Sequence, residues 1–201
     1  MKKIFDLLFS LCLIIVFSVP IFIIAVLIRL TSRGSALYWS DRVGVGNKIF
    51  KMPKFRTMQI DTPAVATHLL KEPDVYLTPI GHFLRKTSLD ELPQLWSVLK
   101  GDMSFVGPRP DVPGYADKLE GKERVILSVK PGITGPATLK FSNEEELLAL
   151  QSDPEKYNDE VLYPQKVRIN LDYIEHQSFF TDIKIIGFTL MSRKRKEPWV
   201  N

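Results

Sequence analysis

The longest apolar stretch of the chain lies near its N-terminus. Residues 7–28, LLFSLCLIIVFSVPIFIIAVLI, contain no charged side chain. As one helix they would extend over ~33 Å at about 1.5 Å per residue, enough to cross the hydrocarbon core of a bilayer. The run is longer than the apolar part of a secretory signal, and no small-x-small cleavage site follows it. The pattern therefore predicts a membrane-associated helix within residues 1–31.

Two features indicate that this helix is broken. Pro20 lies near the middle of the run and removes a helix hydrogen bond, while the hydroxyl of Ser18 can satisfy a freed carbonyl. Basic residues flank both ends, with Lys2 and Lys3 before the run and Arg29 after it. A spanning helix usually shows a charge asymmetry instead. We interpret Ser18 and Pro20 as a membrane break, and the residues alone leave a re-entrant hairpin and a kinked span both open.

From residue 32 onward the pattern is that of a globular domain. Residues 35–43 and 47–58 alternate apolar and polar positions around a glycine-containing turn, which predicts a small β-hairpin. Residues 60–80 are polar and contain three prolines, which predicts a loop. Helical patterns follow at 82–101, 115–127 and 143–151 and after Pro164, while 102–114 and 129–141 read as turn-rich segments. The fold class predicted is α+β: a helix-rich, compact domain with one small β-hairpin.

The C-terminal segment mixes large apolar residues with a basic cluster at 193–196 and Trp199. Such a segment is typical of an interfacial amphipathic helix, although a last helix packed on the core with a solvated basic end would show the same letters. We favour the interface and divide the chain into a membrane segment 1–31, a catalytic domain 32–178 and an interfacial segment 179–201.

Composition narrows the setting only a little. The 201 residues carry a net charge of +4, which suits anionic partners such as nucleic acid, phosphorylated substrates or acidic lipids. The single cysteine, Cys12, excludes a disulfide or a thiolate metal site within the chain. This is consistent with a reducing, cytoplasmic environment.

Residues 87–96, TSLDELPQLW, place two adjacent carboxylates in an apolar stretch. Ser88 and Glu91 have the spacing of a capping box, which would make the pair an ordinary helix start. Pro93 would then fall at the fifth helical position, where its missing N–H is needed. If Asp90 is the cap, Pro93 falls where no N–H bond is made. This favours a helix beginning at Asp90, with both carboxylates ionised at its positive end.

Cations near this pair could hold a phosphate beside it. Mg²⁺ commonly takes one or two carboxylates together with substrate phosphates, so Asp90 and Glu91 are candidate ligands. An ionised aspartate can also attack phosphorus and form an acyl phosphate. The pattern permits phosphoryl transfer but does not require it, because adjacent acids are common at helix starts. The candidate phosphate-binding cations are Lys54, Arg56, Arg85, Lys86 and Arg109.

Three motifs in order carry a resemblance to a known family: KFRTM from residue 54, SLDELPQLWSVLKGDMSFVGPRP from residue 88 and VKPGITG from residue 129. Together with the apolar N-terminus they resemble the small monotopic phosphoglycosyl transferases, the bacterial sugar transferases. The resemblance implies transfer of a phospho-sugar from a UDP-sugar to polyprenyl (undecaprenyl) phosphate, with release of UMP, through a covalent aspartyl phospho-sugar. It implies Asp90 as nucleophile, Glu91 as Mg²⁺ ligand, and Lys54, Arg85 and Arg109 as phosphate-binding residues.

The resemblance also implies a location and partners. It places a re-entrant helix and interfacial helices in the phospholipid of the bacterial inner membrane, with the catalytic domain on the cytoplasmic face. The position of the basic cluster beside the amphipathic tail favours lipid phosphates over nucleic acid, so no nucleic acid partner is expected, and a homodimer stays open. The chain departs from the family pattern in the longer break Ser18-Val19-Pro20, at Ser142 and at Asn170. The longer break concerns the break angle, whereas Ser142 and Asn170 concern sugar or lipid recognition and leave the identity of the substrate open. A non-catalytic membrane adaptor and a tethered phosphatase stay as alternatives.

Overall fold

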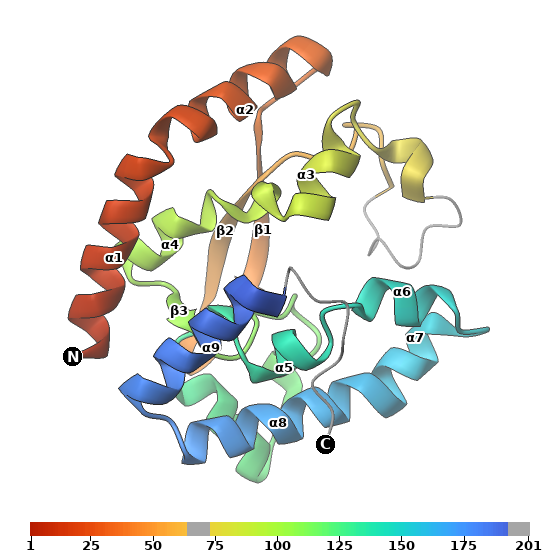
Figure 1. The fold of residues 1–201 in the computed structure, drawn as a ribbon. Helices are drawn as coiled ribbons and strands as arrows, with labels where there is room; N and C mark the ends of the chain where they lie inside the picture. The colour runs from red at the N-terminus through yellow and green to blue at the C-terminus, as the bar shows by residue number, and fades with distance from the viewer. Residues whose placement is uncertain (64–72, 193–201) are drawn as a thin grey trace.

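The computed structural model describes residues 1–63 and 73–192 (Figure 1). The predicted basic cluster at 193–196, Trp199 and the central part of the predicted loop 60–80 lie outside these residues. The fold class is confirmed as helix-rich α+β with small sheets.

The chain begins with two helices, α1 (Lys2–Val16) and α2 (Ser18–Thr31), which we call the N-terminal arm. They are bent by 60° at the break, and the Ser18 hydroxyl donates a 2.7 Å hydrogen bond to the carbonyl of Ile15. Pro20 lies in the first turn of α2, where its missing N–H has no helical partner to lose. The predicted break in the helix is confirmed, but the expectation that Pro20 removes a helix hydrogen bond is wrong, and the place of the break in a membrane stays a prediction. Within the described chain, only the bent pair together has the length and apolar composition to cross a bilayer; no one helix does.

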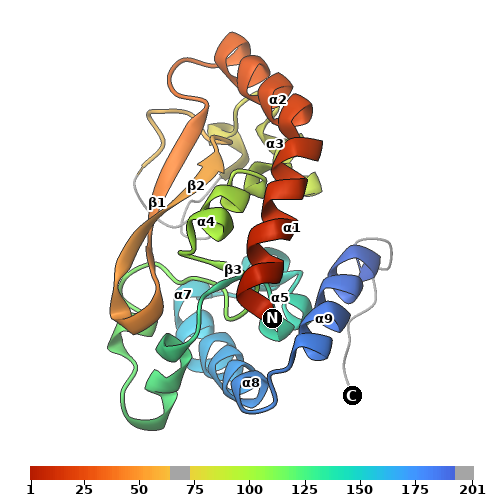
Figure 2. The same cartoon turned by 90° about the vertical axis from the view of Figure 1, so that its left-hand side faces the viewer.

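One side of the arm packs on the domain and the other is exposed. Phe5 and Phe9 of α1 pack against the core, and Ile24 and Ile28 of α2 are buried against β2 and α3. Figure 2 shows α1 running alongside α4. The opposite side is a continuous apolar outer face, made by Ile4, Leu7, Leu8, Leu11, Ile15, Val16, Val19, Phe22, Ile23, Val26, Leu27 and Leu30.

The predicted hairpin is confirmed. Strands β1 (Leu37–Val43) and β2 (Ile49–Phe55) are antiparallel. The turn between them uses positive φ at Gly46 and at Asn47, residue types that tolerate this conformation best. The hairpin brings the end of β2, with Lys54, to the centre of the molecule.

The centre of the domain follows the hairpin. Helices α3 (Gly81–Thr87) and α4 (Gln94–Lys100) are joined by a short 3₁₀ turn, and α4 ends as predicted at Gly101, whose φ is 92°. Strand β3 (Ser104–Val106) then pairs in parallel with β4 (Gly132–Thr134). This pairing was not predicted, because three-residue strands carry no detectable alternation. The predicted helix at 115–127 is instead two 3₁₀ segments.

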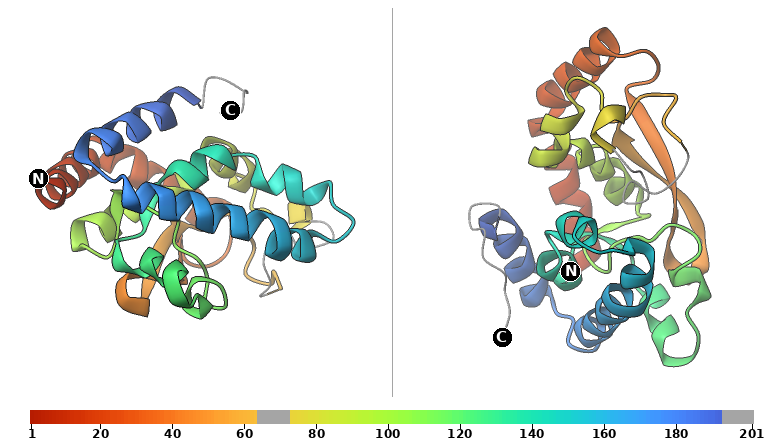
Figure 3. Two further views of the ribbon diagram at one scale, coloured as in Figure 1. Left: turned by 90° about the horizontal axis from the view of Figure 1, so that it is seen from below. Right: turned by 90° about the vertical axis from the view of Figure 1, so that its right-hand side faces the viewer.

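The remaining helices form the lower part of the molecule. They are α5 (Pro136–Lys140), α6 (Glu144–Ala149), α7 (Pro154–Tyr157), α8 (Tyr163–Glu175) and α9 (Phe179–Ser192). Seen from below, α8 crosses in front of the strands, and α9 lies beside the start of α1 (Figure 3). The predicted division at residues 31 and 179 falls at the end of α2 and the start of α9, and it stays a prediction. Helix α1 shares the central core with α4, β3 and α9.

Candidate active site

A large cavity of about 1240 Å³ opens at the centre of the molecule. The 3₁₀ turn before α4 and the end of β2 form one part of its wall, and α5, α6 and α8 form another. Its charged lining residues are Lys54, Asp74, Arg85, Lys86, Asp90, Glu91, Arg109, Asp111, Glu144, Glu146 and Lys166. Of the seven candidate site residues named from the sequence, all except Arg56 are therefore brought to one cavity.

The two predicted catalytic carboxylates lie on the 3₁₀ turn Leu89–Glu91. Ser88, with φ 52° in the left-handed region, ends α3 and redirects the chain into this turn. The next helix begins only at Gln94, directly after Pro93. The prediction that Asp90 caps the helix is wrong, because the left-handed Ser88 creates a separate turn. The alternative capping box is not formed either, since the Ser88 side chain makes no capping hydrogen bond.

Glu91 is held between two cations. Lys54 Nζ from β2 lies 3.0 Å from Glu91 Oε1, and Arg109 Nη2 from the loop after β3 lies 2.5 Å from the same oxygen. Burial alone would raise the pKa of Glu91, but Arg109 and Lys54 outweigh it and hold this pKa well below the usual range. Glu91 is therefore ionised at neutral pH.

Asp90 has a different environment on the same turn. Burial raises its pKa to about 6, and Lys54 and Arg85 only partly oppose this effect. The sequence predicted that a helix terminus would favour the ionised form, so the direction of this expectation is wrong. A carboxylate with this pKa is still mostly ionised at neutral pH, and it is more basic than an ordinary aspartate.

Backbone packing fixes the loop that carries Arg109. Ser104 N–H donates to Pro131 O at 2.9 Å, and Gly107 N–H donates to Thr134 O at 3.0 Å. A Cβ atom on Gly107 would collide with the carbonyl of Lys130, so only glycine permits this approach. The motifs containing GPRP and PGITG thus form one unit that places Arg109.

The two other predicted arginines differ in position. Arg85 on α3 lines the cavity, and its Nε donates to Thr57 Oγ1 at 3.2 Å. Arg56 does not line the cavity. It is 9% exposed, and its guanidinium donates to Ser35 O at 2.7 Å and Ser32 Oγ at 2.8 Å. The geometry gives Arg56 a role at the junction of α2 and the hairpin instead of in the candidate site.

Sequence reasoning missed a second polar group in the cavity. Tyr163 Oη donates to Asp111 Oδ2 at 3.3 Å, and burial raises the pKa of Asp111 to about 6. Lys166 Nζ pairs with Glu144 Oε1 at 2.6 Å. Asp111 follows the GPRP motif directly and could have been noticed, but the other three are brought in from distant helices. Ser142 and Asn170, where the chain departs from the family pattern, also line the cavity.

The candidate site suits a divalent cation only with help from a substrate. In residues 1–63 and 73–192 no group of three or more His, Cys, Asp or Glu side chains is arranged to hold a metal ion. Asp90 and Glu91 supply two carboxylates, and Lys54 and Arg109 share the Oε1 atom of Glu91. Mg²⁺ commonly takes one or two carboxylates and completes its shell with phosphate oxygens and water. The residues present fit that requirement.

The site thus combines a pair of adjacent carboxylates, cations suited to binding phosphate, and two loops joined by backbone hydrogen bonds. This combination suits an enzyme that acts on phosphorylated substrates. The chain belongs to the bacterial sugar transferase family, whose model matches residues 1–195.

Individual relatives are similar over most of the chain. Galactosyl transferase CpsE of Streptococcus agalactiae serotype III (strain NEM316) is 38% identical over 168 residues, which cover 78% of this chain and 34% of that protein. The UDP-glucose:undecaprenyl-phosphate glucose-1-phosphate transferase of Escherichia coli (strain K12) is 34% identical over 196 residues, covering 94% and 39%. The uncharacterized sugar transferase EpsL of Bacillus subtilis (strain 168) is 34% identical over 190 residues, covering 94% and 85%. The chain spans well under half of the first two relatives and most of the third.

Proposed function

We propose that this chain transfers a phospho-sugar from a UDP-sugar to a polyprenyl phosphate, such as undecaprenyl phosphate, and releases UMP. The observation that carries the proposal is the pair of adjacent carboxylates in one cavity that also holds several lysines and arginines: Glu91 is clamped by Lys54 and Arg109, and Asp90 makes no ion pair among the described residues. Family membership and the name of the Escherichia coli relative support the same donor and acceptor classes.

The proposed reaction has two displacement steps. In the first, an oxygen of Asp90 forms a bond to the sugar-linked phosphorus, and the bond from that phosphorus to the bridging oxygen breaks, so UMP leaves. In the second, an oxygen of the polyprenyl phosphate attacks the same phosphorus and releases the Asp90 carboxylate. The raised pKa of Asp90 favours this role, since a more basic carboxylate is a better nucleophile.

The cations have binding and charge-stabilising roles in this proposal. Lys54, Arg85 and Arg109 line the same cavity as Asp90 and would hold the diphosphate of the donor. Glu91 orients Lys54 and Arg109 through a shared oxygen and would bind Mg²⁺ together with Asp90. When bound, Mg²⁺ would neutralise phosphate charge.

We further propose that the N-terminal arm is a re-entrant element in the bacterial inner membrane, with the domain on the cytoplasmic side. The apolar outer face and the 60° bend support this arrangement. Single cysteines can test it in a Cys12→Ala background, by labelling vesicles of known orientation with an impermeant thiol reagent. Lys3→Cys and Arg33→Cys should react from the same, cytoplasmic side. Labelling from opposite sides would show a spanning helix and overturn the re-entrant model.

A UMP-release screen tests the proposed reaction. The wild-type protein, Mg²⁺ and undecaprenyl phosphate are combined with a panel of UDP-sugars, and both UMP and the lipid product are measured. UMP together with polyprenyl-diphosphate-sugar supports the proposal. A non-catalytic adaptor would release no UMP with any donor, and a phosphatase would yield free sugar phosphate without a lipid product.

The covalent route has its own test. Without acceptor lipid, the wild-type protein and its matching UDP-sugar should give an adduct of one phospho-sugar on the peptide containing Asp90, detected by mass spectrometry. Asp90→Asn should show none. Efficient lipid product with no adduct, even after rapid quenching, would indicate direct transfer instead.

A further inference from the structure

Helix α1 directs two charged side chains towards the domain at the start of an otherwise apolar helix. Asp6 is only 6% exposed, although the ten residues that follow it in α1 carry no charge. Lys2 lies one turn earlier and is also partly buried. A buried charge is costly unless it is paired or hydrogen-bonded, so the partners of these two residues indicate what they do.

Both side chains bond to the backbone of β3. The N–H of Phe105 donates to Asp6 Oδ1 at 3.3 Å, and Lys2 Nζ donates to the carbonyl of Val106 at 2.9 Å. Within the described residues the sheet order gives β3 a single neighbouring strand, β4. Helix α1 therefore supplies, through side chains, hydrogen bonds that a second neighbouring strand would otherwise make.

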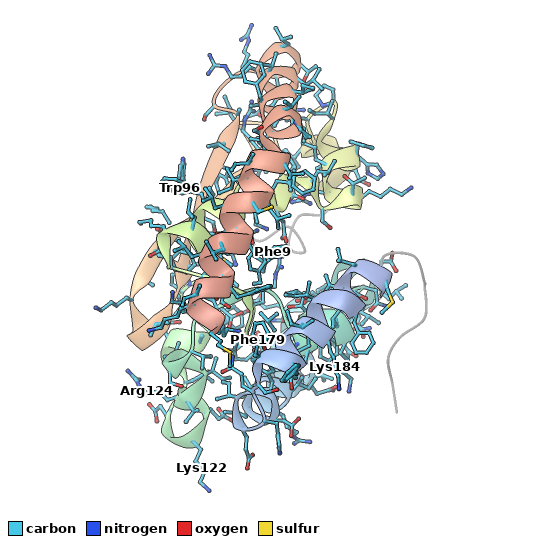
Figure 4. All side chains as sticks on the ribbon, turned by 60° about the vertical axis from the view of Figure 1, so that its left-hand side comes forward. Phe9, Trp96, Lys122, Arg124, Phe179 and Lys184 are labelled. Carbon is cyan, nitrogen blue, oxygen red and sulfur yellow. The ribbon has the colours of Figure 1, made fainter. Side chains whose placement is uncertain are left out.

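Lys2 is fixed in turn by α8 and α9. It forms an ion pair with Asp182, which is 4% exposed, and Tyr173 Oη donates to Asp182 Oδ1 at 2.6 Å. Phe5 of α1 also meets Phe179 of α9 edge to face, with ring centroids 5.4 Å apart. Figure 4 labels Phe179 on α9, where this helix comes near α1. The start of α1 is thus held rigidly against β3.

Strand β3 leads directly to the candidate site. Val106 is followed by Gly107, Pro108 and Arg109, and Arg109 lies 2.5 Å from Glu91 Oε1. The loop has little slack, because Gly107 is bonded to Thr134 and packed against the backbone of the neighbouring loop. A shift of β3 would therefore move Arg109 relative to Glu91.

We infer that Lys2 and Asp6 are positioning residues: they hold β3, and through it Arg109, in the geometry that binds the donor diphosphate. The role rests on the proposed function for its kinetic consequence. The geometry of the phosphate site then depends on how the N-terminal arm packs on the domain. In addition to any anchoring role, the arm then supplies the Lys2 and Asp6 contacts to β3, which a membrane helix of unrelated sequence would lack.

Matched substitutions separate hydrogen bonding from packing. Asp6→Leu removes the acceptor for Phe105 N–H, whereas Asp6→Asn keeps an oxygen in the same place. Lys2→Met removes the donor to Val106, whereas Lys2→Arg keeps a cation, and Lys3→Met removes an equal charge from the exposed side of the same turn. We expect Asp6→Leu and Lys2→Met to lower kcat by about 10- to 100-fold, since small misplacements of binding groups have effects of this size. Asp6→Asn and Lys3→Met should stay within about 3-fold of wild type, the scale expected when no positioning contact is lost.

A double-mutant cycle identifies the route of the effect. UDP affinity is measured by calorimetry for Asp6→Leu, Arg109→Ala and the combination, so the readout does not depend on turnover. If Asp6 acts through Arg109, Asp6→Leu weakens UDP binding in the wild-type background and has almost no further effect beside Arg109→Ala. Equal losses in both backgrounds would show a general structural role and overturn the inference, as would wild-type kcat and UDP affinity in Asp6→Leu and Lys2→Met.

The controls distinguish a failure of the positioning role from a failure of the proposed function. If the wild-type protein releases no UMP with any UDP-sugar, the proposed function fails, and the UDP-binding cycle still decides the positioning role. If thermal melting shows that Asp6→Leu does not fold, the same cycle is run with Lys2→Met, whose side chain is 30% exposed.

Discussion

Asp90 and Glu91 are adjacent on the 3₁₀ turn Leu89–Glu91, but their surroundings differ. On the Glu91 side, Lys54 and Arg109 converge on one carboxylate oxygen, and the pKa lies far below its usual range. On the Asp90 side, burial dominates and raises the pKa to about 6. The comparison teaches that the position of the cations, not the residue type, separates a fixed anion from a reactive one.

The difference between the pKa values of the two carboxylates suits two different roles in the reaction. A carboxylate clamped by two cations is a poor nucleophile, because attack would give up those contacts, but it orders the cations that must meet the phosphates. The partly buried Asp90 carboxylate has fewer contacts, so it is more basic and available to form a bond. The predictions below test this contrast, from the largest expected effect to the smallest.

Removing the proposed nucleophile should have the largest effect. Asp90→Asn keeps the size and polarity of the side chain but cannot form an acyl phosphate, so UMP release should fall by at least about 10⁴-fold. The measurement is UMP release at saturating donor and acceptor, with UDP affinity as the control for an intact site. Residual activity above one per cent of wild type would remove Asp90 from the nucleophile role.

Neutralising the clamped partner should cost less. Glu91→Gln leaves Lys54 and Arg109 without their shared anion and removes a proposed Mg²⁺ ligand, so kcat should fall by about 10²- to 10³-fold. Titration with Mg²⁺ should show a higher half-saturating concentration than for wild type. If Glu91→Gln has an effect as large as Asp90→Asn and an unchanged Mg²⁺ dependence, the contrast between the two carboxylates fails.

The pH dependence of the first step should report the Asp90 side. Because the ionised form reacts and its pKa is about 6, kcat/KM for UMP release without acceptor should be flat above that pH and fall about tenfold per pH unit below it. Lys54→Met should move this limb to higher pH, since Lys54 lowers the pKa of Asp90. A limb near pH 4 in the wild-type protein would show that Asp90 is not desolvated.

The same pKa has a consequence for stability. The folded-state pKa of Asp90 lies above the ordinary value of 3.8, so the stability it allows is fully present below pH 3.8 and is lost as the pH rises through about 6. Asp90→Asn avoids this loss and should be more stable than wild type by about 1–3 kcal/mol at pH 7.5. The gain should vanish near pH 4, as measured by urea unfolding at both pH values. Equal stability at pH 7.5 would argue that the carboxylate is solvated.

The smallest effect on activity is expected at Arg56, which does not line the cavity that holds the two carboxylates. Arg56→Met removes its hydrogen bonds to Ser32 and Ser35 but touches no cavity residue, so kcat and KM should stay within about 3-fold of wild type. Stability should fall by about 1–3 kcal/mol, because two acceptors lose a buried charged donor. A tenfold rise in KM for the donor would return Arg56 to the substrate site.

Local pattern and motif spacing predicted much of the molecule. The apolar run with Pro20 gave the broken helix pair, alternation around glycines gave the hairpin, and Gly101 ended the helix where expected. These features depend on neighbours in the chain, so the sequence contains their causes. The motifs and the basic residues near them also named six residues that line one cavity: Lys54, Arg85, Lys86, Asp90, Glu91 and Arg109.

Only the tertiary structure decided the rest. The sequence placed Asp90 at a helix cap and expected the dipole to favour its ionised form, whereas the left-handed Ser88 and the burial of the turn reverse that expectation. The β3–β4 pairing, the placement of Arg56 and the bonds from Asp6 to β3 join segments far apart in the chain. Desolvation and long-range hydrogen bonds depend on which segments meet after folding, so no local pattern encodes them, and they determine how the two carboxylates differ.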